Sequence, residues 1–469
     1  MILEQYYLGC LAHASYLLGD EETGTGVVVD PQRDIDRYLE EASRLGLEIK
    51  YVFLSHFHAD FLAGHLELRD RVGAKICLGD KAEAEYEITS FEDGEELSFG
   101  NVKLKILHTP GHSPESVCIV VYDLARDAEQ PHAVLTGDTL FIGDVGRPDL
   151  RASLGWTAQD LGALLYDSLH EKVMKLPDDT LLYPTHGAGS MCGKHLSEET
   201  VSAIGVQREY NYALQPMSKQ AFIEIVTADQ SDAPEYFTYD AVLNTKEHAT
   251  LEETLEKNLK PLEMEAALEQ IGKGARILDV REPADFEGAH LEGSLSIALD
   301  GKYATWAGTL LTPEEQIVIV AEPGREEEAA VRLGRIGFDN VAGYLQGGMQ
   351  VLAARQDLVV RSERLTAANL AEQLGTDDPP VVLDVRTENE WAEEHIGGSV
   401  NIPLNHLKER LDELPDSRKV AVHCASGYRS CVALSLLEPK LGNAVMNLVG
   451  GLAAWEAAGL QTVSSAGTS

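Results

Sequence analysis

Three short fragments of this sequence carry side chains that can bind a metal ion. They are residues 55–60 (Ser-His-Phe-His-Ala-Asp), 109–112 (Thr-Pro-Gly-His) and 136–138 (Thr-Gly-Asp). Each fragment follows an apolar run typical of a β-strand, and His186 follows a fourth run of this kind. Ligand-type residues at the ends of four strands are hard to explain by packing alone. The pattern predicts that two imidazoles and one carboxylate share a single ion.

A reactive thiol is the second chemical feature. Cys424 stands between a strand-like run at 419–423 and a predicted helix at 430–437, and Arg429 lies five positions after it. Inward-pointing backbone N–H groups and the positive end of the following helix would stabilise a thiolate and bind an anion. A metal centre and a reactive sulfur in one chain indicate redox chemistry of sulfur.

Length and charge limit the possible functions. At roughly 150 residues per domain, a chain of 469 residues predicts about three domains. The 38 Lys and Arg residues against 77 Asp and Glu residues give a net charge of −39, which argues against a nucleic-acid partner. No apolar stretch reaches the length of a membrane span and no secretory signal is evident, so we expect no membrane role. Six cysteines without a Cys-x-x-Cys pair fit a reducing cytoplasm.

The elements that must position the metal ligands belong to the first 250 residues. Many short strands and few helices are predicted there, which is typical of a sheet-rich α/β domain. The expected strands are residues 26–29, 51–54, 102–107, 116–121, 133–135 and 181–183. Residues 238–260 are rich in Glu, Lys and Thr and precede Pro261, so we expect a hinge there.

The second half of the chain contains a repeat. The sequence Leu-Asp-Val-Arg at 278–281 recurs at 383–386, and each copy ends in a Gly-Gly pair. Short strands alternate with helices in each copy, which predicts a small parallel α/β domain present twice. We therefore expect an α/β multidomain chain with domains at residues 1–250, 258–360 and 362–469.

The first 250 residues resemble the metallo-β-lactamase superfamily. Its signature His-x-His-x-Asp-His is present at 56–61 except for the last position, which is Phe61. The resemblance implies an αββα sandwich, with two mixed sheets face to face and helices outside. Because an aromatic ring cannot donate a lone pair, we expect no second metal.

Within the superfamily, the pattern most resembles the persulfide dioxygenases. This resemblance implies one Fe(II) per chain, held by His56, His112 and Asp138, a ligand set that suits non-haem iron. It also implies supporting roles around the ligands for three further residues, namely His58, Asp60 and His186. The implied substrates are dioxygen and a low-molecular-weight persulfide, such as that of glutathione or coenzyme A.

Two further residues of this region are candidates for substrate contacts. Arg147, in Gly-Arg-Pro-Asp at 146–149, either orients a loop or binds an anionic substrate. Cys192 follows His186 closely enough to approach the metal, and is otherwise an ordinary loop cysteine.

The segment around Cys424 resembles the rhodanese sulfurtransferases, whose cysteine carries a persulfide sulfur. Cys-dependent phosphatases are the look-alike, but their loop has five residues between Cys and Arg, and this loop has four. The resemblance implies catalytic roles for Cys424 and Arg429. Substrate contacts are expected from the rest of the loop, namely Ser426, Gly427, Tyr428 and Ser430.

In the first copy, Glu322 stands where the second copy has Cys424. A carboxylate cannot carry sulfane sulfur, so we expect this rhodanese-like domain to be catalytically silent.

Together the resemblances imply a bifunctional enzyme of sulfur metabolism. It would oxidise a thiol persulfide to sulfite and transfer sulfur at Cys424 to give thiosulfate, or run the reverse exchange. Two alternatives stay open: a thioester hydrolase related to glyoxalase II with an appended sulfurtransferase, and a non-enzymatic sulfur carrier. We expect a cytoplasmic homo-oligomer.

Overall fold

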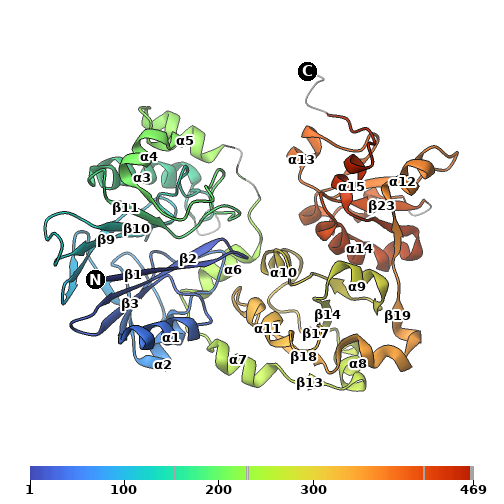
Figure 1. Cartoon of the computed structure of the whole chain (residues 1–469), viewed down its shortest axis with the longest axis horizontal. Coiled ribbons are helices and arrows are strands. Elements are labelled where there is room, and N and C mark those ends of the chain that lie inside the picture. Colours follow the sequence, from blue (N-terminus) through green and yellow to red (C-terminus); the bar gives the residue numbers. More distant parts are fainter. Residues whose placement is uncertain (152–154, 229, 231, 416–417, 465–469) are drawn as a thin grey trace. The chain divides into compact units, whose positions relative to one another are not determined.

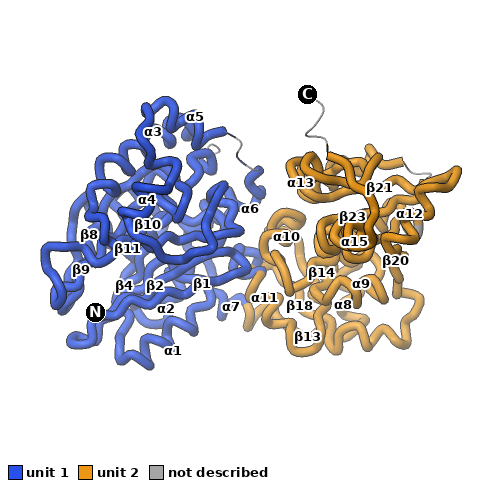
Figure 2. Tube along the Cα trace, turned by 45° about the horizontal axis from the view of Figure 1, so that its top comes forward, with its two compact units in different colours: residues 1–254, 333–338 blue, residues 255–332, 339–469 orange. Residues whose placement is uncertain are grey.

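The computed structural model describes residues 1–151, 155–228, 230, 232–415 and 418–464 (Figure 1). It divides into two compact units (Figure 2). Unit 1 consists of Met1–Thr254 and Leu333–Phe338, and unit 2 of Leu255–Arg332 and Asp339–Ser469. The end of the last predicted domain, 465–469, lies outside the described residues.

Unit 1 contains two six-stranded sheets. The first has the order β1-β2-β3-β4-β5-β6, antiparallel from β1 to β3 and parallel from β3 to β6. Its strands are β1 (Ile2–Leu8), β2 (His13–Asp20), β3 (Thr25–Val29), β4 (Glu48–Phe53), β5 (Lys75–Gly79) and β6 (Thr89–Phe91). The second has the order β12-β11-β10-β9-β8-β7, and only its pair β10 and β11 is parallel. Its strands are β7 (Glu96–Phe99), β8 (Val102–His108), β9 (Val117–Asp123), β10 (Ala133–Gly137), β11 (Leu181–Pro184) and β12 (Ser202–Ala203).

One apolar core lies between the two sheets. Alternate residues of β2, β3 and β4, such as Leu18 and Phe53, pack there against alternate residues of β8 and β9, such as Leu104 and Ile119. A second core covers the other face of the second sheet, where Val120 and Val134 meet the helices. Burial of both faces explains why these strands are nearly all apolar.

Helices cover the outside of both sheets (Figure 1). They are α1 (Asp36–Leu45), α2 (His65–Val72), α3 (Ala158–Glu171), α4 (Ile204–Tyr210) and α5 (Lys219–Thr227), and α6 (Tyr236–Leu243) and α7 (Leu251–Asn258) follow in the chain. The predicted αββα sandwich is therefore confirmed. Within the described residues, no helix combines the length and the apolar character needed to cross a membrane.

The segment predicted as a hinge, residues 238–260, contains the boundary between the two units, after Thr254, but it is largely helical. Most of α6 and all of α7 lie in this segment. Its polar composition does not reveal these helices, although Ala241 and Leu251 are buried in them. Side-chain packing decided the structure here, and composition did not show it.

Unit 2 contains two sheets of the same topology, all parallel. The first has the order β13-β18-β17-β14-β16 and the second β20-β24-β23-β21-β22. The first comprises β13 (Pro261–Leu262), β14 (Arg276–Asp279), β16 (Leu295–Ser296), β17 (Ile317–Val320) and β18 (Val341–Leu345). The second comprises β20 (Glu363–Leu365), β21 (Val381–Asp384), β22 (Val400–Asn401), β23 (Val420–His423) and β24 (Val445–Leu448). A small antiparallel pair joins β15 (His290–Leu291) to β19 (Val359–Val360).

The repeated Leu-Asp-Val-Arg sequence has the same structure in both copies. Arg281 forms an ion pair of 2.6 Å with Asp279 and donates to the carbonyl of Ala289. Arg386 likewise pairs with Asp384 at 2.7 Å and donates to a carbonyl in the equivalent turn. The helices of unit 2 are α8 (Met264–Gly272), α9 (Pro283–Gly288), α10 (Tyr303–Leu310), α11 (Glu326–Gly334), α12 (Ala367–Leu374), α13 (Glu388–Glu393), α14 (Tyr428–Leu441) and α15 (Gly451–Ala457).

Candidate metal centre and reactive cysteine

The predicted metal-binding fragments follow four strands of unit 1. His56 comes after β4, and the second sheet supplies His112 after β8, Asp138 after β10 and His186 after β11. Gly137 permits the sharp turn into Asp138, since its φ is +52° and a Cβ there would lie 2.6 Å from Oγ of Ser55.

His56, His112 and Asp138 are buried and converge. Their ligand atoms all lie within 4.8 Å of one another. Nε2 of His112 is 3.5 Å from Oδ2 of Asp138, and Nε2 of His56 is 3.9 Å from the same oxygen. Two imidazoles and one carboxylate therefore face a common point, as the sequence pattern requires.

The outer nitrogens of both imidazoles have partners that fix the rings. Nδ1 of His112 donates to the carbonyl of Arg147 at 2.9 Å, which leaves the lone pair on Nε2 directed at Asp138. Nδ1 of His56 lies 2.9 Å from Oγ of Ser55. Burial lowers the pKa of both imidazoles, well below the usual value for His56, so they are neutral. Neutral, oriented imidazoles beside a carboxylate fit a divalent metal ion.

His186 holds the carboxylate of Asp138. Its Nδ1 lies 2.8 Å from Oδ1 of Asp138, and its Nε2 lies 2.9 Å from Oδ2 of Asp60. Burial opposes protonation, but the two carboxylates overcome it and raise the pKa of His186 well above its usual value. An imidazolium that bridges two carboxylates fixes Asp138 in its orientation.

His58 and Phe61 also lie beside the ligand set, with the His58 ring 4.2 Å from that of His56. Nε2 of His58 is 3.0 Å from Oδ1 of Asp30, so this imidazole is held by a carboxylate. The Phe61 ring stacks on it with centroids 4.3 Å apart and is only 1% exposed. Phe61 therefore fills the space beside His58 with an apolar ring.

Cys192 lies close to His186 and Asp60, which is one of the two positions that the sequence analysis left open. Its sulfur belongs to a second buried set of possible ligand atoms, with Asp60 and His186, that lie within 4.8 Å of one another. Burial and the nearby carboxylate of Asp60 raise the pKa of Cys192 to about 12, so without a bound cation it is a neutral thiol.

Arg147 uses its side chain to hold its own loop. The guanidinium donates two hydrogen bonds to Asp149, at 2.8 and 2.7 Å, and one to the carbonyl of Met191 at 3.1 Å. With its backbone carbonyl on His112, Arg147 orients the loop and the ligand. This geometry favours the first of the two roles that the sequence left open.

Two residues of the site escaped the sequence analysis. Asp30 follows β3 as the other ligand-type residues follow their strands, and it also accepts the backbone N–H of Ser55 at 2.7 Å. That position after a strand was a signal that could have found it. His13 is buried with its ring 4.1 Å from Phe61 and 5.7 Å from His186, and nothing in its local sequence marks it.

The loop of Cys424 surrounds its sulfur as expected. The backbone N–H of Gly427 donates to Sγ of Cys424 at 3.1 Å, and Oγ of Ser430 lies 3.6 Å from it. Helix α14 begins at Tyr428, two residues earlier than predicted, so its positive end lies directly at the loop. The thiol itself is only 1% exposed, whereas Ser426 is exposed.

Arg429 has a partner that the sequence did not indicate. Its guanidinium pairs with both carboxylate oxygens of Glu390 at 2.7 Å. Burial opposes ionisation of Glu390, but the hydrogen bonds from Arg429 and from the backbone of Thr387 overcome it and lower its pKa to about 2. The loop is thus anchored to α13 at neutral pH.

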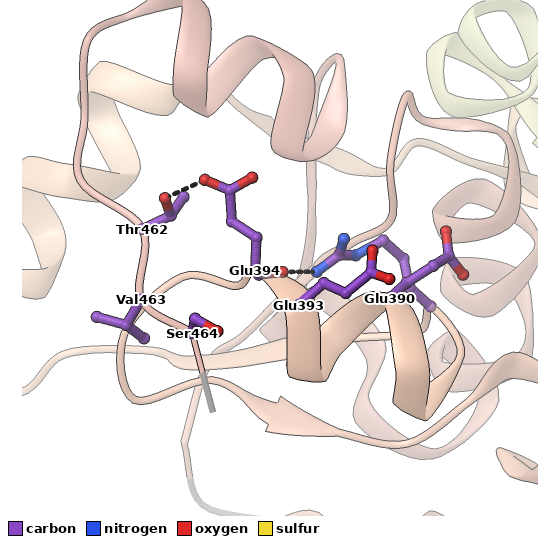
Figure 3. Close-up of a pocket in the computed structure, with 7 residues that line it drawn as sticks. Glu390, Glu393, Glu394, Thr462, Val463 and Ser464 are labelled. Atoms are coloured by element: carbon purple, nitrogen blue, oxygen red, sulfur yellow. Dashed lines mark hydrogen bonds between the residues drawn. The ribbon is translucent and has the colours of Figure 1, made fainter. Parts of the chain in front are cut away.

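Glu390 also borders a pocket of about 380 Å³ (Figure 3). In it Arg386 donates to the backbone carbonyl of Glu394, and Thr462 contacts the Glu394 carboxylate. The other lining residues are Glu393, Val463 and Ser464. The pocket shares Glu390 with the ion pair of Arg429, and no residue of the sulfur loop is among those that line it.

The corresponding loop of the first copy is exposed and acidic. Glu322 is exposed, and Arg325 pairs with Asp300 at 2.9 Å and with Glu328 at 2.9 Å. We therefore expect the Glu322→Ala variant to retain dioxygen consumption and sulfur transfer within about twofold of wild type, as is usual for exposed substitutions. Steady-state rates of both reactions check this. A large loss in a variant that melts like wild type would contradict a silent first loop.

Comparisons with known proteins agree with this architecture. The profile of the metallo-beta-lactamase superfamily matches residues 8–186. The profile of the rhodanese-like domain matches twice, at residues 263–355 and 366–458. The fold class predicted from the sequence is therefore confirmed.

Similarity to individual proteins indicates which family within the superfamily the chain resembles. The human mitochondrial persulfide dioxygenase ETHE1 is 31% identical over 228 residues, which are 48% of this chain and 80% of the human protein. A probable hydroxyacylglutathione hydrolase from Schizosaccharomyces pombe is 26% identical over 206 residues, 42% of this chain and 74% of that protein. The crystal structure of a metallo-beta-lactamase from Staphylococcus aureus has a TM-score of 0.66 and 28% identity, covering 74% of this chain and 98% of that chain.

The match to the human enzyme covers most of that relative's length, and the rhodanese-like profile matches two stretches in the second half of this chain. Homology thus connects both halves with sulfur metabolism. The chain belongs to the persulfide dioxygenase family of the metallo-beta-lactamase superfamily and carries two rhodanese-like domains in addition.

Proposed function

We propose that this protein oxidises a low-molecular-weight thiol persulfide to sulfite in unit 1 and forms thiosulfate from persulfide and sulfite at Cys424. The first reaction is RSSH + O2 + H2O → RSH + SO3²⁻ + 2H⁺, with glutathione or coenzyme A as the thiol. The observation that carries this proposal is the convergence of His56, His112 and Asp138 in a chain that also holds a cradled thiol.

In unit 1, His56, His112 and Asp138 would hold one Fe(II). A bound ferrous ion supplies electrons to dioxygen, which zinc cannot do. The chain's own residues orient these ligands: Ser55 and the carbonyl of Arg147 fix the imidazoles, and the His186 imidazolium fixes the carboxylate. The apolar ring of Phe61 keeps the space beside His58 free of a further ligand.

In unit 2, Cys424 would carry the outer sulfur of the persulfide. The thiolate attacks that sulfur, the sulfur–sulfur bond of the donor breaks, and the donor leaves as a thiol. Sulfite then attacks the sulfur on Cys424, giving thiosulfate and the free thiolate. The N–H of Gly427, 3.1 Å from Sγ, and the start of α14 stabilise the negative charge that returns to Cys424.

Metal analysis tests the proposal for unit 1. We expect one iron per chain in protein purified without oxygen, and consumption of dioxygen with glutathione or coenzyme A persulfide. The Cys192→Ser variant should keep the full iron content, because Cys192 belongs to the separate set with Asp60 and His186. Two zinc ions per chain, or loss of metal on replacement of Cys192, would contradict a single iron site.

A thioester hydrolase is the second candidate, because a probable hydroxyacylglutathione hydrolase is among the relatives. Lactoylglutathione distinguishes the two functions. Turnover of this thioester at rates that match or exceed those with glutathione persulfide would favour the hydrolase.

A further inference from the structure

Helix α14, which follows the Cys424 loop, docks on the first rhodanese-like domain of unit 2 (Figure 1). Oγ of Ser435 accepts the backbone N–H of Ser296 in β16 at 3.0 Å. Further along the helix, the Glu438 carboxylate lies 3.0 Å from Nε2 of His290 and accepts a hydrogen bond from Ser362 at 2.5 Å. The helix is therefore held by polar contacts along its length.

Tyr428, the first residue of α14, reaches into the first domain. Its hydroxyl donates to the carbonyl of Ala298 at 2.9 Å. Its ring lies directly on Gly301, where a Cβ would come within 2.4 Å of Cε2 and 2.7 Å of Cζ of the tyrosine. The absence of a side chain at Gly301 is thus the condition for this position of Tyr428.

The segment that receives Tyr428, residues 298–301, is fixed within the first domain. Arg332 donates to the carbonyl of Leu299 at 2.6 Å and to that of Gly301 at 3.2 Å. The backbone N–H of Leu299 also donates to Val280 at 3.0 Å. Tyr428 therefore contacts a backbone segment whose position is fixed by the first domain, whereas Tyr428 itself belongs to the second.

This contact lies one residue from the group that faces the sulfur. Tyr428 follows Gly427, whose N–H donates to Sγ of Cys424 and whose φ is +116°. A shift of Tyr428 moves the Gly427 Cα through the peptide group that joins the two residues, and the nitrogen that donates to the sulfur is bonded to that Cα. The position of the N–H against the sulfur thus depends on residues 298–301.

We propose that residues 298–301 of the first rhodanese-like domain position the reactive loop of the second, with Tyr428 as the positioning residue. The inference rests on the proposed sulfur transfer at Cys424 and gives the silent domain a part in it. When sulfite removes the outer sulfur, the electron pair of the broken bond stays on Cys424. The Gly427 N–H then meets a growing negative charge, so its placement acts on kcat more than on KM.

The proposal is tested by a substitution that adds a single methyl group to the silent domain. We expect Gly301→Ala to lower kcat for thiosulfate formation from glutathione persulfide and sulfite about tenfold, with KM for sulfite nearly unchanged. The matched control is Gly272→Ala, at the end of α8 in the same domain, where a Cβ meets nothing within 4 Å. This control should transfer sulfur like wild type.

A double variant separates contact from general damage. In a Tyr428→Ala background the added methyl group has no ring to meet, so Gly301→Ala should cause no further loss. Losses that multiply, or a wild-type rate in Gly301→Ala, would overturn the proposal. Tyr428→Phe removes only the bond to Ala298 and should slow kcat about threefold. If Gly301→Ala fails to fold, a wild-type kcat in Tyr428→Phe overturns the proposal on its own.

Alkylation of Cys424 by iodoacetamide tests the positioning of the loop separately from the proposed sulfur transfer. If the wild-type chain forms no thiosulfate, the proposed transfer fails. The alkylation rates of the wild type, Gly301→Ala and Gly272→Ala then still test the positioning. A rate changed by Gly301→Ala alone supports it, and three equal rates refute it.

Discussion

Replacement of Cys424 by serine is expected to abolish thiosulfate formation and to leave dioxygen consumption unchanged. A hydroxyl group forms no persulfide, so the loss should exceed about a thousandfold. The proposed iron ligands belong to unit 1 and the thiol to unit 2, so we expect the first reaction not to need the sulfur. Thiosulfate and dioxygen measured in one incubation with persulfide and sulfite check both parts.

The matched control for this variant is Cys10→Ser, at a partly exposed cysteine of unit 1. It should retain both reactions. Thiosulfate formation at more than a few per cent of the wild-type rate in Cys424→Ser would mean that another group carries the sulfur.

Replacement of His112 by alanine is expected to remove the iron and the dioxygen consumption together. The carbonyl of Arg147 orients this imidazole, and Oδ2 of Asp138 lies 3.5 Å from its Nε2, so the variant leaves only two of three ligands. We expect iron to fall below about a tenth of an ion per chain, because an open two-ligand site binds Fe(II) weakly. Iron analysis reports this loss independently of activity.

His65→Gln is the control for a buried histidine that is not a ligand. His65 begins α2, and its Nδ1 lies 3.1 Å from the carbonyl of Ala63. This variant should keep its iron even if it melts earlier. Sulfur transfer at Cys424 should survive in both variants, and full iron in His112→Ala would remove His112 from the ligand set.

The sequence sufficed for features that follow from local rules. His56, His112 and Asp138 could be found because each follows an apolar strand, and strand ends of a sandwich lie close together. The parallel topology of the repeats followed from alternating strands and helices. Such patterns depend on the period of the backbone, which neighbouring residues alone determine.

Features that depend on distant contacts were missed. Glu390 precedes Arg429 by 39 residues, and their ion pair exists only because α13 and α14 pack in one domain. Asp30 supports His58 and Ser55 through the same kind of long-range contact. The helices of the polar segment 238–260 were missed because composition does not show which of its apolar side chains find a partner.

The paired Asp and Arg of the repeated sequence have a consequence for how such a duplicated domain changes. Asp279 with Arg281, and Asp384 with Arg386, close a turn inside each copy, where each arginine donates to a backbone carbonyl of its own copy. Each copy is thus stabilised by an ion pair of its own residues. A mutation that removes the reactive residue of one loop leaves this ion pair intact. A duplicated domain can therefore lose its activity, remain folded and serve as structural support for the active copy.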